Sequence, residues 1–317
     1  MTPKYFLVCV FQVAINLPLI AQTSTSFLDA FDAISDQPIF LLSDEITTDI
    51  PEGGHLQGIQ VSGNKIFISG SSNEYGYVSI FKGNQTSLEF IGIKQLSEKP
   101  YTHAGGIQIS NQWLAVGCED SEGKETSLVV LQDVSNGSAI AGKPTYVLKR
   151  EGKKKLATAG AVALLKRKDH FLLAVASWDA ATIDFYSSNH TYPSKEDFEF
   201  KQWTTWDRET SRHKGWIDKK SPAYQNIQLF EDSCGIFIVG MGMNNKGQHV
   251  ADVYSVEAEK DKYDMLTKVR SRTFKLPGSA SFRNGSGIVK DGEKLSLWTV
   301  SKHLKPKTFV AMFPTTL

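Results

Sequence analysis

The sequence predicts an all-β fold built from one repeated unit, and two observations lead to this prediction. The stretch from His103 to Gly117 has the pattern of a strand, a tight polar turn and a second strand, and the stretch from His55 to Ser69 repeats it. Apolar strands separated by turn residues then recur at intervals of about 48 to 65 residues, close to the roughly 40 to 50 residues of the larger known repeat units with insertions added. A chain of 317 residues is long enough for one large domain of this kind.

Taken in order, the first four predicted units have four strands each and the fifth has three. The first has Gly58–Ser62, Lys65–Ser69, Gly76–Lys82 and Leu88–Ile93; the second Gly106–Ser110, Trp113–Gly117, Ser127–Gln132 and Thr145–Lys149; the third Gly160–Leu165, Phe171–Ser177, Thr182–Ser187 and Phe198–Trp203; the fourth Asn226–Phe230, Gly235–Gly240, Val250–Val256 and Leu266–Phe274; the fifth Gly287–Val289, Leu295–Val300 and Thr308–Phe313.

One further strand is predicted at Pro38–Ser43, ahead of the first unit and without a partner nearby. The fifth unit lacks an outer strand, so we expect Pro38–Ser43 to complete it and to close a ring without open sheet edges. With hairpins such as His103–Gly117, Thr158–Ser177 and Asn226–Gly240, the chain resembles the β-propeller superfamily. The resemblance implies an all-β, five-bladed propeller of four-stranded antiparallel blades and leaves the function open. A pair of β-sandwiches or an irregular β-solenoid is the alternative.

The ends of the repeat divide the chain into three parts. Residues 1–21 have a basic residue, an apolar run and Ala21 before a polar stretch, which predicts a signal peptide. A membrane anchor is the alternative, but Gln12, Asn16 and Pro18 interrupt the run. Residues 22–37 then form an N-terminal arm and residues 38–317 a single propeller domain. We expect a secreted or periplasmic protein with no membrane span after removal of the signal peptide.

The charge of the chain is nearly balanced, with 35 Lys and Arg against 34 Asp and Glu. A protein dominated by nucleic-acid binding needs a basic excess, so no nucleic-acid partner is predicted, and we expect a monomer. Calcium loops, phosphate-binding glycine motifs and a Gly-x-Ser-x-Gly motif are absent from the sequence. The sequence therefore identifies no cofactor.

Candidate site residues follow from the geometry of a propeller. The loop before each first strand and the loop after each second strand lie on one face, here called the upper face, and equivalent positions converge on the axis. The ligand-binding residues predicted in this upper central funnel are His55, Gln57, Tyr101, His103, Trp178, Asp179, Gln225, Asn284 and Lys302.

The two histidines of this set, His55 and His103, lie in adjacent units and can contact a ligand or transfer a proton near neutral pH. Hydrogen bonding to loop carboxylates is their structural alternative. Together with Glu119 and Asp179 they are the candidate catalytic residues, because two carboxylates at a suitable separation can cleave a glycoside. No third imidazole or carboxylate completes a metal site, so no metal is predicted.

Basic loops are also predicted on the upper face. They are Lys149–Lys155 and the connection from Trp206 to Ser221, to which Lys302, Lys305 and Lys307 add. Such a basic rim would attract an acidic glycan or a phosphate, with Trp206 or Trp216 as a stacking surface. Solvated loops that keep the protein soluble are the alternative.

The leading functional prediction is a secreted binding or interaction protein that holds a carbohydrate, another anionic ligand or another protein in its upper central funnel. The alternative is a hydrolase of the glycosidase or phosphoesterase type on the same scaffold. A purely structural interaction module without pocket chemistry is the third reading.

Overall fold

The computed structural model describes residues 25–83, 87–135, 143–213, 221–257, 259–260, 262–276 and 278–316. The predicted signal peptide, residues 1–21, lies outside these ranges. Within them, no helix has the length and apolar character needed to cross a membrane.

The described residues are nearly all β. The elements are α1 (Phe27–Asp32), β1 (Ile39–Ser43), β2 (Leu56–Ser62), β3 (Lys65–Ser71), β4 (Gly76–Gly83), β5 (Ser87–Gln95), β6 (His103–Ser110), β7 (Trp113–Glu119), β8 (Thr126–Asp133), β9 (Tyr146–Glu151), β10 (Ala161–Lys166), β11 (Phe171–Ala176), a 3-10 turn η1 (Trp178–Ala180), β12 (Thr182–Ser188), β13 (Phe200–Asp207), β14 (Ala223–Asp232), β15 (Gly235–Met243), β16 (His249–Val256), β17 (Leu266–Phe274), β18 (Ser286–Asp291), β19 (Lys294–Val300) and β20 (Phe309–Phe313).

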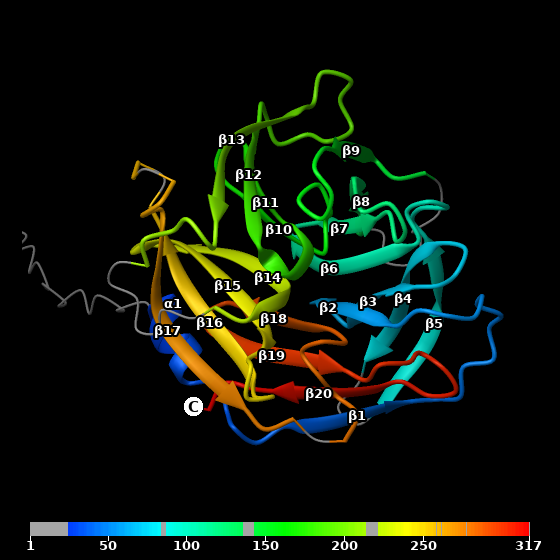
Figure 1. Cartoon of the computed structure of the whole chain (residues 1–317). Helices are drawn as coiled ribbons and strands as arrows, with labels where there is room; N and C mark the ends of the chain where they lie inside the picture. The colour runs from blue at the N-terminus through cyan, green and yellow to red at the C-terminus, as the bar shows by residue number, and fades with distance from the viewer. Residues whose placement is uncertain are drawn as a thin grey trace, which may run out of the picture.

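Consecutive strands pair antiparallel in runs. The runs are β2 to β5, β6 to β9, β10 to β13 and β14 to β17. A further run consists of β18, β19 and β20, and β1 pairs with β20 at its outer edge. In Figure 1 the first strand of each run lies toward a common centre and the last strand lies outside. Since the first strands of neighbouring runs contact one another, the runs pack side by side around this centre.

A few backbone contacts join neighbouring runs into larger sheets. β18 meets β2 at Ser286 and Gly58, and β10 meets β6 at Ala161 and Gly106, both in parallel orientation. β1 also touches β5 in parallel. The sheets are therefore one closed barrel of eight strands, one sheet of eight strands and one of four, which is β14 to β17.

Side-chain amides tie the central strands together. Gln60 Nε2 donates to the Ile288 carbonyl at 3.1 Å, and Gln108 Nε2 donates to the Leu229 carbonyl at 2.8 Å. Asn226 Nδ2 donates to the Gln57 carbonyl at 2.9 Å, so β14 is bonded to β2 although the two strands are not paired. All three donor residues are buried. These three contacts, here called the axial amide bridges, satisfy backbone groups that no strand ladder reaches.

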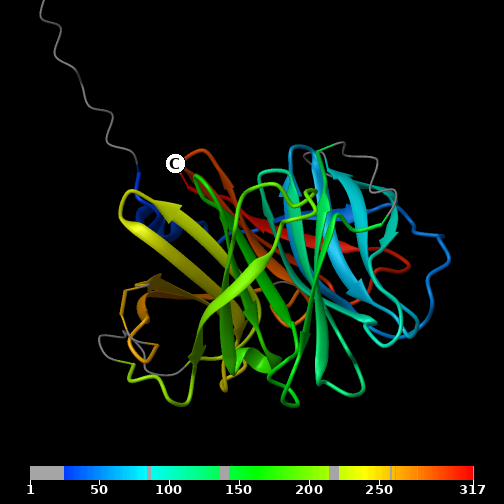
Figure 2. The same ribbon diagram turned by 90° about the horizontal axis from the view of Figure 1, so that it is seen from above.

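The N-terminal arm contains the helix α1, which packs against β14 to β17 and β18 to β20. Ser26 caps it by accepting a hydrogen bond from the Asp29 amide, as N-cap serines do. Phe27 stacks on Phe230 at 4.8 Å between ring centroids. Arg272 donates to the Phe31 carbonyl at 2.8 Å. Figure 2 shows the helix beside the yellow strands of β14 to β17, so the arm covers the seam between two runs.

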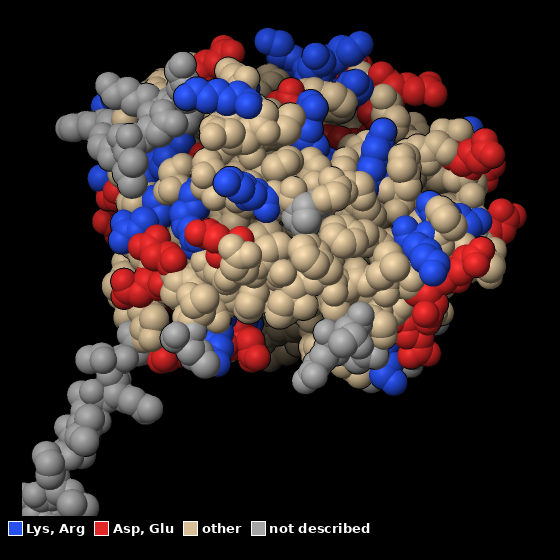
Figure 3. Space-filling view, turned by 90° about the horizontal axis from the view of Figure 1, so that it is seen from below, with Lys and Arg blue, Asp and Glu red and all other residues tan. Residues whose placement is uncertain are grey.

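The outer face of β1 is apolar and exposed. Phe40 and Leu42 are exposed and alternate with buried Leu41 and Ser43, as expected for a strand with one face on the core, and Ile39 at the start of the strand is exposed as well. Phe40 stacks on Phe309 of β20. In Figure 3, which shows the side on which β1 lies, uncharged residues fill the centre of the view and many Lys and Arg residues gather at its upper edge.

Most observed strands lie close to their predicted ranges, but one is displaced. β13 begins at Phe200, whereas a strand from Phe198 was predicted. The Phe198 amide donates to the Lys195 carbonyl in a turn, and its ring packs edge-on against Tyr146 at 4.8 Å. An apolar residue in a turn, such as Phe198, therefore cannot be distinguished by its residue type from the first residue of a strand.

Candidate functional site

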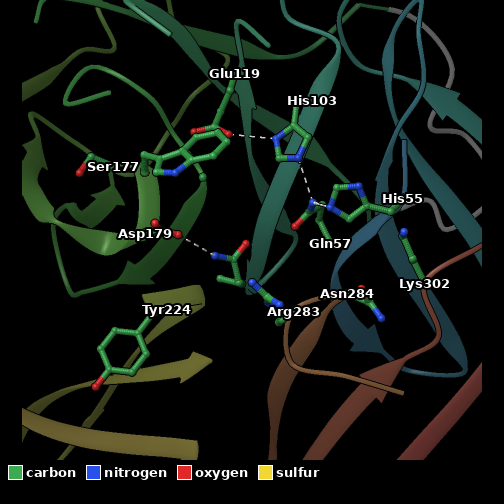
Figure 4. Close-up of a pocket in the computed structure, with 13 residues that line it drawn as sticks. His55, Gln57, His103, Glu119, Ser177, Asp179, Tyr224, Arg283, Asn284 and Lys302 are labelled. Atoms are coloured by element: carbon green, nitrogen blue, oxygen red, sulfur yellow. Dashed lines mark hydrogen bonds and ion pairs between the residues drawn. The ribbon is translucent and has the colours of Figure 1, made fainter. Parts of the chain in front are cut away.

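A cavity of about 450 Å³ lies where the central strands meet, on the face that carries the loops before β2, β6, β14 and β18 (Figure 4). Nine of the ten predicted site residues line it: His55, Gln57, His103, Glu119, Trp178, Asp179, Gln225, Asn284 and Lys302. Tyr101 does not line the cavity. Its side chain is half-buried against the cluster that contains Ile107 and Cys118.

Four lining residues were missed in the sequence: Gly160, Ser177, Tyr224 and Arg283. Ser177 lies at the end of a predicted second strand, the position that pointed to Trp178 and Asp179. Arg283 lies one residue before Asn284, in the loop that leads into β18. The loop-position argument could therefore have found both residues.

The hairpin of β6 and β7 places His103 opposite Glu119. The two strands pair from Ser110 and Trp113, so only two residues form the turn, and Asn111 adopts a positive φ of 56° that asparagine tolerates. The pairing extends to His103 and Glu119 at the far end. There Nδ1 of His103 lies 2.9 Å from Oε2 of Glu119. Turn chemistry and register therefore bring this imidazole and this carboxylate together.

Irregular pairing aims two glutamines into the cavity. The register between β2 and β3 shifts at Gln57, and the register between β14 and β15 shifts at Gln225. A bulge of this kind re-aims a side chain and is common beside functional sites. Both glutamines line the cavity as a result.

Gln57 links the two histidines. Its Nε2 lies 2.9 Å from Nε2 of His103 and also contacts Nε2 of His55. An amide nitrogen only donates, so both imidazole nitrogens accept, and Nδ1–H of His103 is left to donate to Glu119. The imidazole centroids are 5.5 Å apart. The chain of contacts thus runs from His55 through Gln57 and His103 to Glu119.

His55 is neutral near pH 7. Burial of the ring is the largest cause that lowers the pKa of His55 from 6.5 to about 4, and electrostatic interactions with His103, Lys302 and His303 contribute further. A neutral ring is the form that accepts the hydrogen bond from Gln57.

Glu119 is buried with one oxygen unengaged. Its side chain is 3% exposed, and Oε1 has no hydrogen-bond partner among the described residues. A Cβ at position 160 would lie 3.3 Å from Oε1, so Gly160 leaves space beside this oxygen. A buried polar atom without a partner is uncommon in native proteins and is costly unless a ligand or water satisfies it.

Asp179 provides a second carboxylate, which is exposed at the cavity. It lies in η1 with φ 57°, a conformation that costs energy for most residues. Oδ1 accepts a hydrogen bond from Gln225 Nε2 at 3.4 Å. The neighbouring Trp178 is half-buried and carries Lys124 Nζ over its ring at 3.8 Å.

Two residues of the predicted basic rim, Trp206 and Arg150, are buried. Trp206 is 1% exposed in the core and cannot stack on a ligand, while Trp216 lies outside the described residues. Arg150 is buried and paired with Asp184 of β12. Among the described residues, no group of three His, Cys, Asp or Glu side chains could hold a metal ion.

No family profile and no curated protein matches this sequence. Solved structures match at low identity. An endo-arabinase from Bacteroides thetaiotaomicron gives a TM-score of 0.48 at 8% identity, over 87% of this chain and 98% of that one. An exo-β-1,3-galactanase from Phanerochaete chrysosporium gives 0.49 at 10%, over 89% and 63%. A GH32 β-fructofuranosidase from Bombyx mori gives 0.46 at 11%, over 89% and 64%, so this chain spans less than two thirds of that protein.

The chain resembles the β-propeller superfamily. This part of the sequence-based prediction is confirmed, since the runs of antiparallel strands pack around one centre. The leading functional prediction, a propeller that binds without catalysis, is corrected. The three solved structures are named as a β-fructofuranosidase, an exo-β-1,3-galactanase and an endo-arabinase, and none of the three is named as a binding protein without catalysis. Likeness at this level describes the fold alone, and the chemistry of the propeller depends on its own pocket residues.

Proposed function

We propose that this propeller is a hydrolase that cleaves a glycosidic bond in its central cavity. The observation that carries the proposal is Glu119, a buried carboxylate with one oxygen fixed by His103 and the other unengaged. Asp179 supplies the second carboxylate of the same cavity. A pair of carboxylates that flanks the scissile bond is the usual equipment for glycoside hydrolysis.

In the proposed reaction Glu119 acts as the base and Asp179 as the acid. Oε1 of Glu119 takes a proton from a water molecule, whose oxygen bonds to the anomeric carbon as the glycosidic carbon–oxygen bond breaks. Asp179 gives its proton to the departing oxygen, and solvent then returns the two carboxyl groups to their starting states. The exposed position of Asp179 suits proton exchange with water, whereas the buried position of Glu119 suits a fixed base.

His103 and Gln57 are positioning residues in this scheme. His103 holds Oε2 of Glu119 through Nδ1, and Gln57 holds the opposite nitrogen of the same ring. A base whose orientation is fixed before substrate binds loses less free energy on reaching the transition state.

We also propose the finer architecture of the scaffold. The chain is a five-bladed propeller of four-stranded blades, and β1 closes the ring as the outer strand of the last blade. The pairing of β1 with β20, from Ile39 and Met312 to Leu42 and Phe309, supports this closure. Residues 1–21 are a signal peptide, residues 22–37 an arm and residues 38–317 the propeller of a secreted or periplasmic monomer.

A panel of 4-nitrophenyl glycosides, with 4-nitrophenyl phosphate beside them, tests the proposed reaction. We expect release of nitrophenol from at least one glycoside, and a fall in kcat of about 100-fold or more in Glu119→Gln, the size usual for loss of a general base. Glu122→Gln is the matched control, because Glu122 is exposed on the loop that follows β7.

Thermal unfolding of both variants checks that folding is intact. Two results would reject the proposal: a Glu119→Gln protein that folds and keeps its glycosidase activity, or hydrolysis of the phosphate ester alone.

A further inference from the structure

Two cations of the central cavity have no carboxylate partner. Arg283 lies in the loop before β18, and Lys302 follows β19. Within the described ranges, neither side chain forms an ion pair. Other arginines are engaged in ion pairs: Arg150 pairs with Asp184, and Arg212 pairs with Asp264 at 2.9 Å.

The charges of the cavity are separated in space. Figure 4 shows Lys302 beside His55, with Arg283 and Asn284 on the side of the cavity away from Glu119. Glu119 comes from β7 and Asp179 from η1, whereas both cations flank β18 and β19. One wall of the cavity is therefore acidic and the other is basic.

Lys302 of the basic wall also acts on the neighbouring His55 ring. After burial and the electrostatic interaction with His103, the charge of Lys302 is a further cause that lowers the pKa of His55. The His55 ring therefore does not add a charge of its own near neutral pH, and Arg283 and Lys302 remain the positive groups of this wall.

We infer that the substrate is an anionic saccharide, whose carboxylate or sulfate group is bound by Arg283 and Lys302 while its glycosidic bond faces Glu119. The contact between the glycosidic bond and Glu119 rests on the proposed function, whereas the contact of the anionic group with Arg283 and Lys302 does not. A neutral sugar would leave both cations without a counter-charge, whereas a planar carboxylate or a sulfate can take paired hydrogen bonds from a guanidinium group. The same contact would fix which end of the sugar points toward the carboxylates.

Binding is measured with non-cleavable sugars, so that it does not depend on catalysis. Titration calorimetry on the full chain compares methyl β-galactoside, its 6-sulfate and methyl β-galacturonide, with the corresponding glucosides as a second series. We expect one anionic sugar to bind about 10- to 100-fold tighter than its neutral parent, the usual effect of a charge-assisted contact. The preferred anion identifies the group as a carboxylate or a sulfate.

Variants assign the preference to the two cations. Arg283→Gln and Lys302→Gln are each expected to reduce the ratio of anionic to neutral affinity by about 10-fold. Lys307→Gln, an exposed lysine on the same connection that does not line the cavity, is expected to leave the ratio unchanged. Equal binding of anionic and neutral sugars by the parent protein, or an unchanged ratio in both cavity variants, would overturn the inference.

The two proposals can fail separately. Tight binding of a uronide or a sulfated sugar, lost in Arg283→Gln, without cleavage of any glycoside would reject the hydrolase and keep the anion site. Cleavage of neutral glycosides with no preference for charge would reject the anion site and keep the hydrolase.

Discussion

Acidification from pH 7 to pH 4 is expected to weaken the folded protein through His55. The pKa of this ring is about 4 in the folded chain, against 6.5 for an unperturbed histidine such as that of the unfolded chain. The folded state therefore binds fewer protons than the unfolded state between these values. The stability that neutral His55 contributes is present above pH 6.5 and is lost as the pH falls through 4.

The size of this loss follows from the shift. Each pKa unit corresponds to about 1.4 kcal/mol, which sets an upper limit of about 3 kcal/mol on the fall from 6.5 to about 4. The ring is partly exposed at the cavity, so solvent screening reduces the expected loss to about 1 to 2 kcal/mol.

Urea unfolding of the parent protein and of His55→Gln at pH 7, 5.5 and 4 measures this contribution. Glutamine does not titrate and can keep a hydrogen bond to Gln57, so the difference in unfolding free energy between the two proteins isolates His55. His249, whose pKa burial also lowers, is present in both proteins and cancels. A difference that stays constant from pH 7 to pH 4, or one that grows in favour of the parent, would refute this reasoning.

Two further predictions concern packing away from the cavity. Phe31, fully buried in α1, is expected to cost about 3 to 5 kcal/mol of unfolding free energy when replaced by Ala; a loss below about 1 kcal/mol in urea unfolding would mean that the arm does not contribute to the fold. Lys268→Ala is expected to cost about 3 to 5 kcal/mol, because it leaves Asp252, its buried partner at 2.9 Å, without a counter-charge. Restored stability in the Lys268→Met, Asp252→Leu double variant would support this cause, and an unchanged midpoint in Lys268→Ala would contradict it.

The sequence was most informative where local rules decide the structure. The hairpin at His103 could be recognised because a short polar turn that contains Asn111 separates two strands rich in apolar residues, and this pattern acts over a few residues. The order of strands and loops in the repeat indicated that His55 and Glu119 belong to one face.

The sequence was least informative where the position of a residue depends on an irregular backbone. Tyr101 was predicted among the ligand-binding residues of the funnel. Its amide instead donates to the Glu98 carbonyl in a turn, so the alternation of β6 does not extend back to it. Trp206 was expected in a loop but lies on β13, facing the core. The contact of Gln57 with both histidines depends on a bulge, and no pattern in the sequence predicts that bulge.

The axial amide bridges also determine how molecules reach the cavity. Because Asn226 and Gln108 bond to strands on the other side of the centre, side chains fill the middle of the molecule beneath the cavity. The bridges close the axis at these contacts, so a substrate reaches the cavity from the face that carries its loops, and a product leaves it from the same face.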